Sequence, residues 1–122
     1  SIPPRKLSLD DPLHPSWRGT PRKVLRGFQA REVEVEPLEG GAVQVVVNVN
    51  EPLTVHLGDN GPYRGFQRVG EEWRPLPIGS TLNNQQGTFA WLPGPGFSGD
   101  YDLAFLSDRG EMLRIVVRVF CP

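Results

Sequence analysis

The chain has 122 residues and a formal net charge of −1, and 38% of its residues are hydrophobic. This length fits a single domain that can bury one core without disulfides or metals. The small net charge gives the chain no strong overall attraction to nucleic acid or to anionic membranes. No apolar run approaches the roughly 20 residues that a membrane-spanning helix needs, and no signal peptide is visible. The single cysteine, Cys121, excludes an intramolecular disulfide and is expected to be a passive free thiol.

Residues 1–23 are predicted to form an extended arm. They contain five prolines, which remove backbone donors and bias the preceding residues toward extended geometry. Residues 1–31 carry seven arginine and lysine residues against two aspartates, whereas residues 32–122 carry six arginines against twelve acidic residues. A basic arm therefore precedes an acidic body. Two interpretations stay open: the arm lies on its own domain, or it docks on an acidic neighbouring subunit.

From Val24 onward, hydrophobic and polar residues alternate with a period of two, which is the signature of β-strands. The ranges that alternate are 31–37, 43–49, 53–57, 88–92, 101–105 and 113–119. A short hairpin is predicted in 66–76, and turns are predicted at 38–41, 58–62 and 107–110. Residues 74–82 contain two prolines and are predicted to be an edge strand or a loop.

Seven to nine short strands in about 100 residues predict an all-β, immunoglobulin-like sandwich of two sheets at residues 24–122. A partly open barrel is the alternative. No stretch keeps a helical apolar stripe for three turns, and the sequence shows neither an internal repeat nor a second domain.

The stretch Gly87-Thr-Phe-Ala-Trp-Leu-Pro-Gly-Pro-Gly-Phe-Ser-Gly-Asp-Tyr101 resembles the late strands of immunoglobulin-like and cadherin-like domains in bacterial surface and secreted proteins. The turn Asp108-Arg109-Gly110 and a β-branched last strand complete the resemblance, which covers residues 63–119. It implies an immunoglobulin-like fold, with Tyr101 in a tyrosine-corner arrangement, and it specifies function poorly. The acidic and asparagine-rich runs of calcium-binding cadherin-like repeats are missing from the sequence.

The outer face of the last predicted hairpin should be polar, yet Ala104, Leu106, Val116 and Phe120 fall on it. An exposed apolar patch often marks a contact surface. Either the arm covers this patch with residues such as Trp17, or a partner protein does. The predicted partner contacts are therefore Trp17, Leu106, Val116 and Phe120.

The sequence offers little for catalysis or metal binding. Only two histidines are present, and no nucleophile is predicted beside either of them. Asp100 and Asp102 share one strand face, where they are expected to be the polar side of an alternating strand rather than a pair of catalytic carboxylates. No cluster of metal ligands is evident. We therefore expect no enzyme activity, no metal and no cofactor.

Aromatic side chains could instead stack on sugars. Tyr63 and Trp73 lie on either side of the first strand of the predicted hairpin at 66–76 and could share a face, which makes them candidates for ligand stacking. The favoured hypothesis is a non-catalytic structural or protein-interaction module of a bacterial surface or secreted assembly, whose arm docks on a neighbouring subunit. The alternative is a carbohydrate-binding or adhesive module appended to a larger protein. Neither nucleic acid nor membrane insertion is expected.

Overall fold

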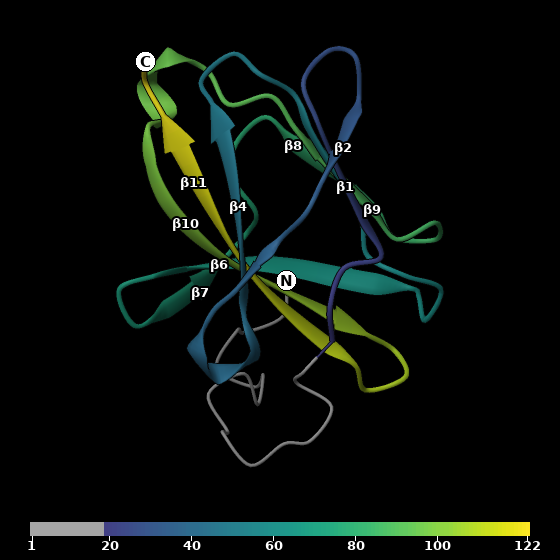
Figure 1. Cartoon of the computed structure of the whole chain (residues 1–122). Coiled ribbons are helices and arrows are strands. Elements are labelled where there is room, and N and C mark those ends of the chain that lie inside the picture. The colour runs from purple at the N-terminus through teal and green to yellow at the C-terminus, as the bar shows by residue number, and fades with distance from the viewer. Residues whose placement is uncertain (1–18) are drawn as a thin grey trace.

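A computed structural model of the chain describes residues 19–122 (Figure 1). These residues form β-strands and two short 3-10 turns. The strands are β1 (Lys23–Arg26), β2 (Arg31–Val33), β3 (Glu36–Pro37), β4 (Val43–Asn48), β5 (Leu53–His56), β6 (Tyr63–Val69), β7 (Glu72–Arg74), β8 (Ser80–Asn83), β9 (Thr88–Trp91), β10 (Gly99–Ser107) and β11 (Met112–Phe120). The 3-10 turns are η4 (Glu39–Gly41) and η5 (Pro95–Phe97).

The order of the strands identifies the architecture. One sheet has the order β2-β1-β5-β9-β8, and the other has the order β3-β4-β11-β10-β6-β7. If β1, β5, β9 and β8 are taken as A, B, E and D, and β6, β10 and β11 as C, F and G, these are the two sheets of the immunoglobulin fold. The predicted fold class is confirmed: the protein is an immunoglobulin-like sandwich. β4 adds a strand that runs parallel to the last strand, β11.

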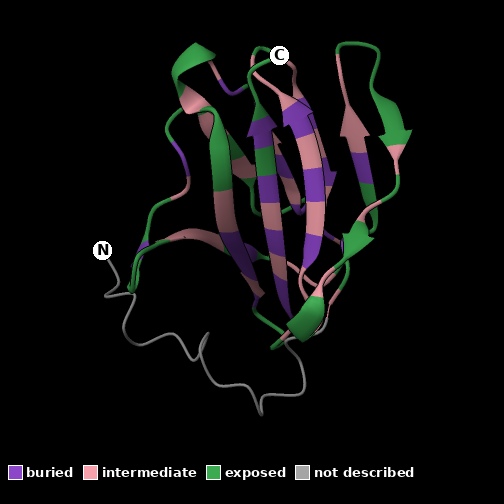
Figure 2. Cartoon of the chain, turned by 60° about the vertical axis from the view of Figure 1, so that its left-hand side comes forward, coloured by how far each residue is buried: buried purple, intermediate pink, exposed green. Residues whose placement is uncertain are grey.

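The core lies between the two sheets. Figure 2 shows buried residues alternating with more exposed ones along the strands, as the period-two pattern predicted. The inward rows are Val43, Val45 and Val47 on β4, Leu53 and Val55 on β5, Phe89 and Trp91 on β9, Leu103 and Phe105 on β10, and Leu113, Ile115, Val117 and Val119 on β11. None of these residues is more than 5% exposed. Burial of this apolar surface is the main force that holds the sheets together.

Tyr101 ties the loop before β10 to the sandwich. Its hydroxyl donates a hydrogen bond to the carbonyl oxygen of Phe97, four residues upstream, at 3.0 Å. Its ring packs edge-on against Trp91, with ring centroids 4.9 Å apart. Burial raises the pKa of the Tyr101 hydroxyl, so it remains a donor at neutral pH. This is the tyrosine-corner bond that the sequence predicted.

Residues 31–37 do not form the single strand that their alternation predicted. β2 pairs with β1 in the five-stranded sheet, whereas β3 pairs with β4 in the six-stranded sheet. The chain therefore changes sheets between Val33 and Glu36, and Val33 and Val35 both pack against the core as it crosses. Alternation continues through the crossing, so it cannot reveal the change. With this split, residues 19–122 form eleven strands, more than the predicted seven to nine.

A second, smaller cluster of apolar side chains lies on the outer face of the six-stranded sheet. Its members are Phe66, Trp73, Ala104, Leu106 and Met112, which we call the outer-face cluster. Ala104 and Met112 are fully buried although their strand neighbours Leu103 and Leu113 point into the core. Trp73 lies between two arginines, with the guanidinium carbons of Arg68 and Arg114 at 5.3 and 5.5 Å from its ring centroid. The six-stranded sheet is therefore packed on both faces in the region of β6, β7, β10 and β11.

The described part of the predicted arm is residues 19–23, and it contacts the domain. The Gly19 N–H donates to the Met112 carbonyl at 3.1 Å, and Lys23 already opens β1. Residues 1–18, including the predicted contact residue Trp17, lie outside the described residues.

Candidate functional site

One turn, residues 49–52, joins three other segments at one end of the sandwich. The Val49 N–H donates to the Phe120 carbonyl at 2.8 Å, and the Asn50 N–H donates to the Pro93 carbonyl at 2.6 Å. The Gly27 N–H donates to the Pro52 carbonyl at 2.8 Å. We call residues 27–30, 49–52, 92–93 and 120 the loop end; it is the upper end in Figure 1, near the C-terminus. Backbone bonds thus fix four separate segments relative to one another.

Exposed apolar side chains concentrate at the loop end. Of the large hydrophobic residues exposed within residues 19–122, Phe28 (80%), Leu92 (50%) and Phe120 (48%) lie there. The other two, Val69 and Ile78, lie in the β6–β7 hairpin and the β7–β8 connection. Exposed apolar residues that gather on loops held by a rigid scaffold are typical of a contact surface.

Strained backbone lies in the same place. Among residues 19–122, only Ala30 and Asn50 have positive φ without being glycine, with values of 52° and 63°. An asparagine tolerates this left-handed conformation, whereas an alanine is disfavoured there by about 1 kcal/mol or more. Strain of this kind tends to cluster at functional sites, where the surrounding structure holds it in place. Both residues belong to the loop end.

Glu51 locks the turn to the hairpin formed by β1 and β2. Its Oε1 accepts hydrogen bonds from the Asn48 N–H at 2.9 Å and from Arg26 Nε at 2.8 Å. Partial burial acts to raise the pKa of Glu51, but these two bonds and the charges of Arg26 and Arg31 outweigh it and lower the pKa. The carboxylate is therefore ionised at neutral pH.

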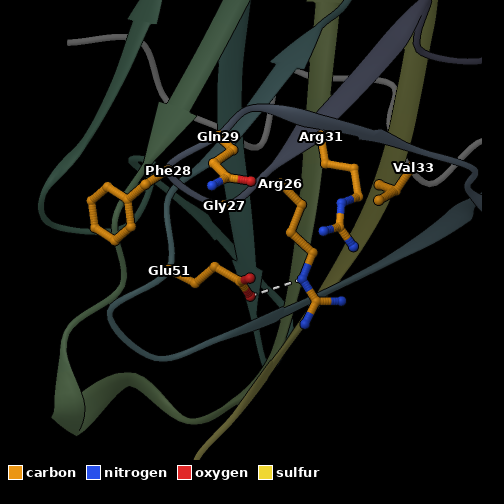
Figure 3. A pocket seen from close by; sticks show the side chains of 7 residues that line it. All are labelled: Arg26, Gly27, Phe28, Gln29, Arg31, Val33 and Glu51. Atoms are coloured by element: carbon orange, nitrogen blue, oxygen red, sulfur yellow. Dashed lines mark hydrogen bonds and ion pairs between the residues drawn. The ribbon is translucent and has the colours of Figure 1, made fainter.

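A pocket of about 410 Å³ opens beside this ion pair. Figure 3 shows its lining: Arg26, Arg31 and Val33 on one side, Phe28 and Gln29 from the hairpin turn, and Glu51 below them. Arg26 and Arg31 are direct cross-strand neighbours, and they form the pair next to the hairpin turn. The pocket combines positive charge, one amide and an exposed aromatic ring, which suits a ligand with both an acidic and an apolar part.

Comparison with known proteins adds a structural likeness. No family model matches the sequence, and no curated protein matches it. A solved structure, "Drosophila OTK, extracellular domains 3-5", is similar to the chain with a TM-score of 0.39 and 11% sequence identity. The likeness covers 87% of this chain and 38% of that one. We assign the fold from the strand order and the Tyr101 bond.

The predicted apolar patch of Ala104, Leu106, Val116 and Phe120 is not continuous. Ala104 and Leu106 belong to the outer-face cluster, whereas Phe120 belongs to the loop end. Between them, Asp102 receives bonds from Arg114 at 2.7 and 3.0 Å, and Asp100 receives bonds from Arg118 at 2.9 and 3.1 Å. The outward residues of β11 therefore alternate between apolar side chains and arginines. The prediction of one patch was wrong because it counted the apolar residues without their charged neighbours.

The two aromatic residues predicted to stack on a ligand are both buried. Tyr63 is 1% exposed and lies in the main core, where its hydroxyl accepts a bond from the Asn60 N–H at 3.1 Å. Trp73 is 7% exposed and lies in the outer-face cluster. They occupy opposite faces of the six-stranded sheet. The expectation of a shared exposed face is therefore corrected.

The residues considered for chemistry are separated or paired. Each of Asp100 and Asp102 has its own arginine, and the hydrogen bond from Arg118 lowers the pKa of Asp100. The Nδ1 atom of His56 lies 3.3 Å from the hydroxyl of Thr88 on the neighbouring strand. Within residues 19–122, no group of three or more metal-ligating side chains comes together. In the same range, no helix is long and apolar enough to cross a membrane.

Phe120 was predicted from the sequence as a candidate contact residue, but Phe28 and Leu92 were not. Phe28 stands in a polar turn between Gly27 and Gln29, directly after β1. A large aromatic residue in a glycine-containing turn is the signal that would have marked it. Leu92 comes directly after β9, in which Phe89 and Trp91 point inward. Its side chain is exposed. Only the fold brings it to the same end as Phe28.

Proposed function

We propose that the protein is a non-catalytic protein-interaction module that contacts a partner protein through the loop end. The observation that supports this most directly is the concentration of Phe28, Leu92 and Phe120 at one end of a rigid sandwich. Interfaces are anchored by a few large side chains, and aromatic anchors are prominent among them.

The state of the sheet edges also favours the loops. The edge strands β2, β3, β7 and β8 have two to four residues each. Arg31, Glu32, Glu36, Pro37, Glu72 and Arg74 occupy three of these four edges. Short, charged or proline-containing edges discourage the addition of a strand from another chain. The described residues therefore offer a loop surface more readily than a sheet edge.

A carbohydrate-binding role has less support. The stacking residues that would carry it, Tyr63 and Trp73, are buried, and the exposed aromatic residues at the loop end are Phe28 and Phe120. Sugar-binding sites usually add polar side chains that bond the hydroxyl groups. A catalytic role also lacks support, since each of the two paired carboxylates is bound to an arginine.

The proposal extends to the context of the module. The resemblance of residues 63–119 to bacterial surface and secreted domains favours a secreted or cell-surface assembly. We further propose that the basic arm, residues 1–23, connects the domain to a neighbouring subunit. Gly19, in the described end of the arm, bonds to the carbonyl of Met112, whose side chain belongs to the outer-face cluster. Light scattering of the full chain against a version lacking residues 1–18 tests this role: loss of self-association with the fold retained supports it, and monomers in both cases contradict it.

The main proposal is tested with binders selected from a display library of random peptides against the full chain. One variant carries Phe28→Ser, Leu92→Ser and Phe120→Ser; the matched control carries Val69→Ser and Ile78→Ser, which are also exposed. Each lost anchor is expected to cost more than about 1 kcal/mol, so affinity should fall at least tenfold for the first variant and stay unchanged for the control. Binders that retain full affinity for the first variant would place the contact surface elsewhere.

A further inference from the structure

The β1–β2 hairpin carries an excess of positive charge next to its turn. Arg26 and Arg31 face each other directly across the two strands. Like charges in this position destabilise a strand pair. One carboxylate, Glu51, lies with them in the pocket, and it is engaged by Arg26 Nε and the Asn48 N–H. Within residues 19–122, Arg31 makes no ion pair, and its charge acts on Glu51 only from beyond ion-pair distance.

The pocket beside Arg31 offers both polar and apolar contacts. Its volume is about 410 Å³, and Phe28, which lines it, is 80% exposed. The amide of Gln29 and the guanidinium of Arg31 supply hydrogen-bond donors, and Val33 and Phe28 supply apolar surface (Figure 3). The negative charge of Glu51 repels an anionic ligand, and the repulsion grows with the charge of the ligand. A singly charged carboxylate is therefore favoured over a doubly charged phosphate.

We propose that this pocket binds the carboxylate of an aspartate or glutamate side chain of the partner protein, between Arg31 and Arg26, with an adjacent apolar residue of the partner against Phe28. A guanidinium matches the planar carboxylate with two parallel hydrogen bonds. The bound carboxylate also removes the repulsion between the two arginines. This inference rests on the proposed function, because it assigns the charge that the partner presents to the loop end.

The test uses two blocked tripeptides, Ac-Leu-Glu-Leu-NH2 and Ac-Leu-Gln-Leu-NH2, which differ in one charge. Each is titrated into the full chain at low salt, and binding is followed by the NMR shifts of the backbone amides. We expect the glutamate peptide to shift residues 26–33 and Glu51 and to bind about fivefold more tightly than the glutamine peptide, since a partly exposed ion pair contributes up to about 1 kcal/mol. The difference should shrink at high salt, which screens the charges.

Two variants isolate the role of Arg31. Arg31→Gln removes the charge and relieves the repulsion with Arg26, so it should fold, and it should bind both peptides equally weakly. Arg64→Gln removes an exposed arginine on β6, in the other sheet, and should retain the preference for the glutamate peptide. Equal shifts from both peptides, a preference that survives Arg31→Gln, or stronger shifts from inorganic phosphate would each overturn the inference.

These outcomes are separable from the test of the proposed function. Library binders that depend on Phe28 but not on Arg31 would support the loop end as the contact surface and contradict the proposed binding of a partner carboxylate at Arg31. Binders that map to another surface would remove the loop end itself, whatever the tripeptides do.

Discussion

The guanidinium of Arg26 and the carboxylate of Glu51 meet at 2.8 Å although 25 residues separate them in the chain. Arg26 ends β1, and Glu51 lies in the turn after β4, so this bond fastens the first hairpin to the turn at residues 49–52. Both side chains are partly buried, with exposures of 30% and 25%. This pair therefore adds to the backbone bonds that hold the loop end together, and it forms part of the pocket wall.

Replacing Glu51 with glutamine should lower the free energy of unfolding by about 1 kcal/mol at pH 7. The folded-state pKa of Glu51 lies below its ordinary value of 4.5, so its contribution is present above that value and is lost as the pH falls through the folded pKa. Urea denaturation at neutral and acidic pH measures this, and the variant and wild type should converge in acid. Glu72→Gln, which breaks an exposed pair with Arg74, should change little at either pH. A deficit that persists undiminished in acid would contradict the assigned charge.

Replacing Ala30 with glycine should stabilise the fold by about 0.5–1 kcal/mol, because glycine adopts positive φ without the steric cost that alanine bears. The matched control is Ala42→Gly. Ala42 has φ of −80°, so there the added freedom of glycine in the unfolded chain should destabilise the fold. Thermal unfolding of both variants gives the comparison, and a shift of the same sign in both would argue against strain at Ala30.

Removing the hydroxyl of Tyr101, with Tyr101→Phe, should lower the free energy of unfolding by about 1–2 kcal/mol. The variant loses the bond to Phe97 and leaves that carbonyl without its side-chain partner in a partly buried position. Ser98→Ala, an exposed substitution in the same loop, should be close to neutral. Denaturant unfolding distinguishes the two, and a neutral Tyr101→Phe would mean that ring packing alone holds this corner.

Met112→Ala should lower the free energy of unfolding by about 2–4 kcal/mol, although Met112 lies on the outer face of its sheet. The side chain is fully buried in the outer-face cluster, so truncation leaves a cavity. Ile78→Ala, at a residue that is 84% exposed, should have almost no effect. Equal effects from the two substitutions would show that the outer-face cluster is not packed in solution.

The period-two pattern was sufficient for the core and for most of the turns. Leu53, Val55 and Leu57 point inward as predicted, and the predicted hairpin at Gly70 is the connection between β6 and β7. Alternation depends only on the local pleat, so it cannot show where a strand leaves one sheet for the other, as between Val33 and Glu36. Alternation also cannot show which side chains surround an apolar residue on the neighbouring strands. For this reason it predicted one patch that contains both Leu106 and Phe120.

The candidate site was only partly within reach of the sequence for the same reason. Phe28, Leu92 and Phe120 are far apart in the chain and meet at one end only through the turn at residues 49–52. The pairing of Arg26 with Arg31 depends on where the first hairpin turns, and the four residues 27–30 carry a weak turn signal with a single glycine. Tyr101 was predictable because its role is local, reaching four residues back.

The parallel pairing of β4 with β11 has a mechanical consequence. Gly19 lies beside the first residues of β11, and Phe120 ends the same strand, so a pull between these two points acts along the length of the sandwich. Such a pull loads β1 first, because β1, β2 and β3 lie between Gly19 and β4 in the chain. When these three strands have been pulled away, β4 is drawn from its first residue and β11 from its last. The six residue pairs from Val43–Ile115 to Asn48–Phe120 would then carry the load in shear, all together, instead of opening one after another like a zip. A parallel strand pair loaded in this way resists extension more than strands whose residue pairs separate one at a time.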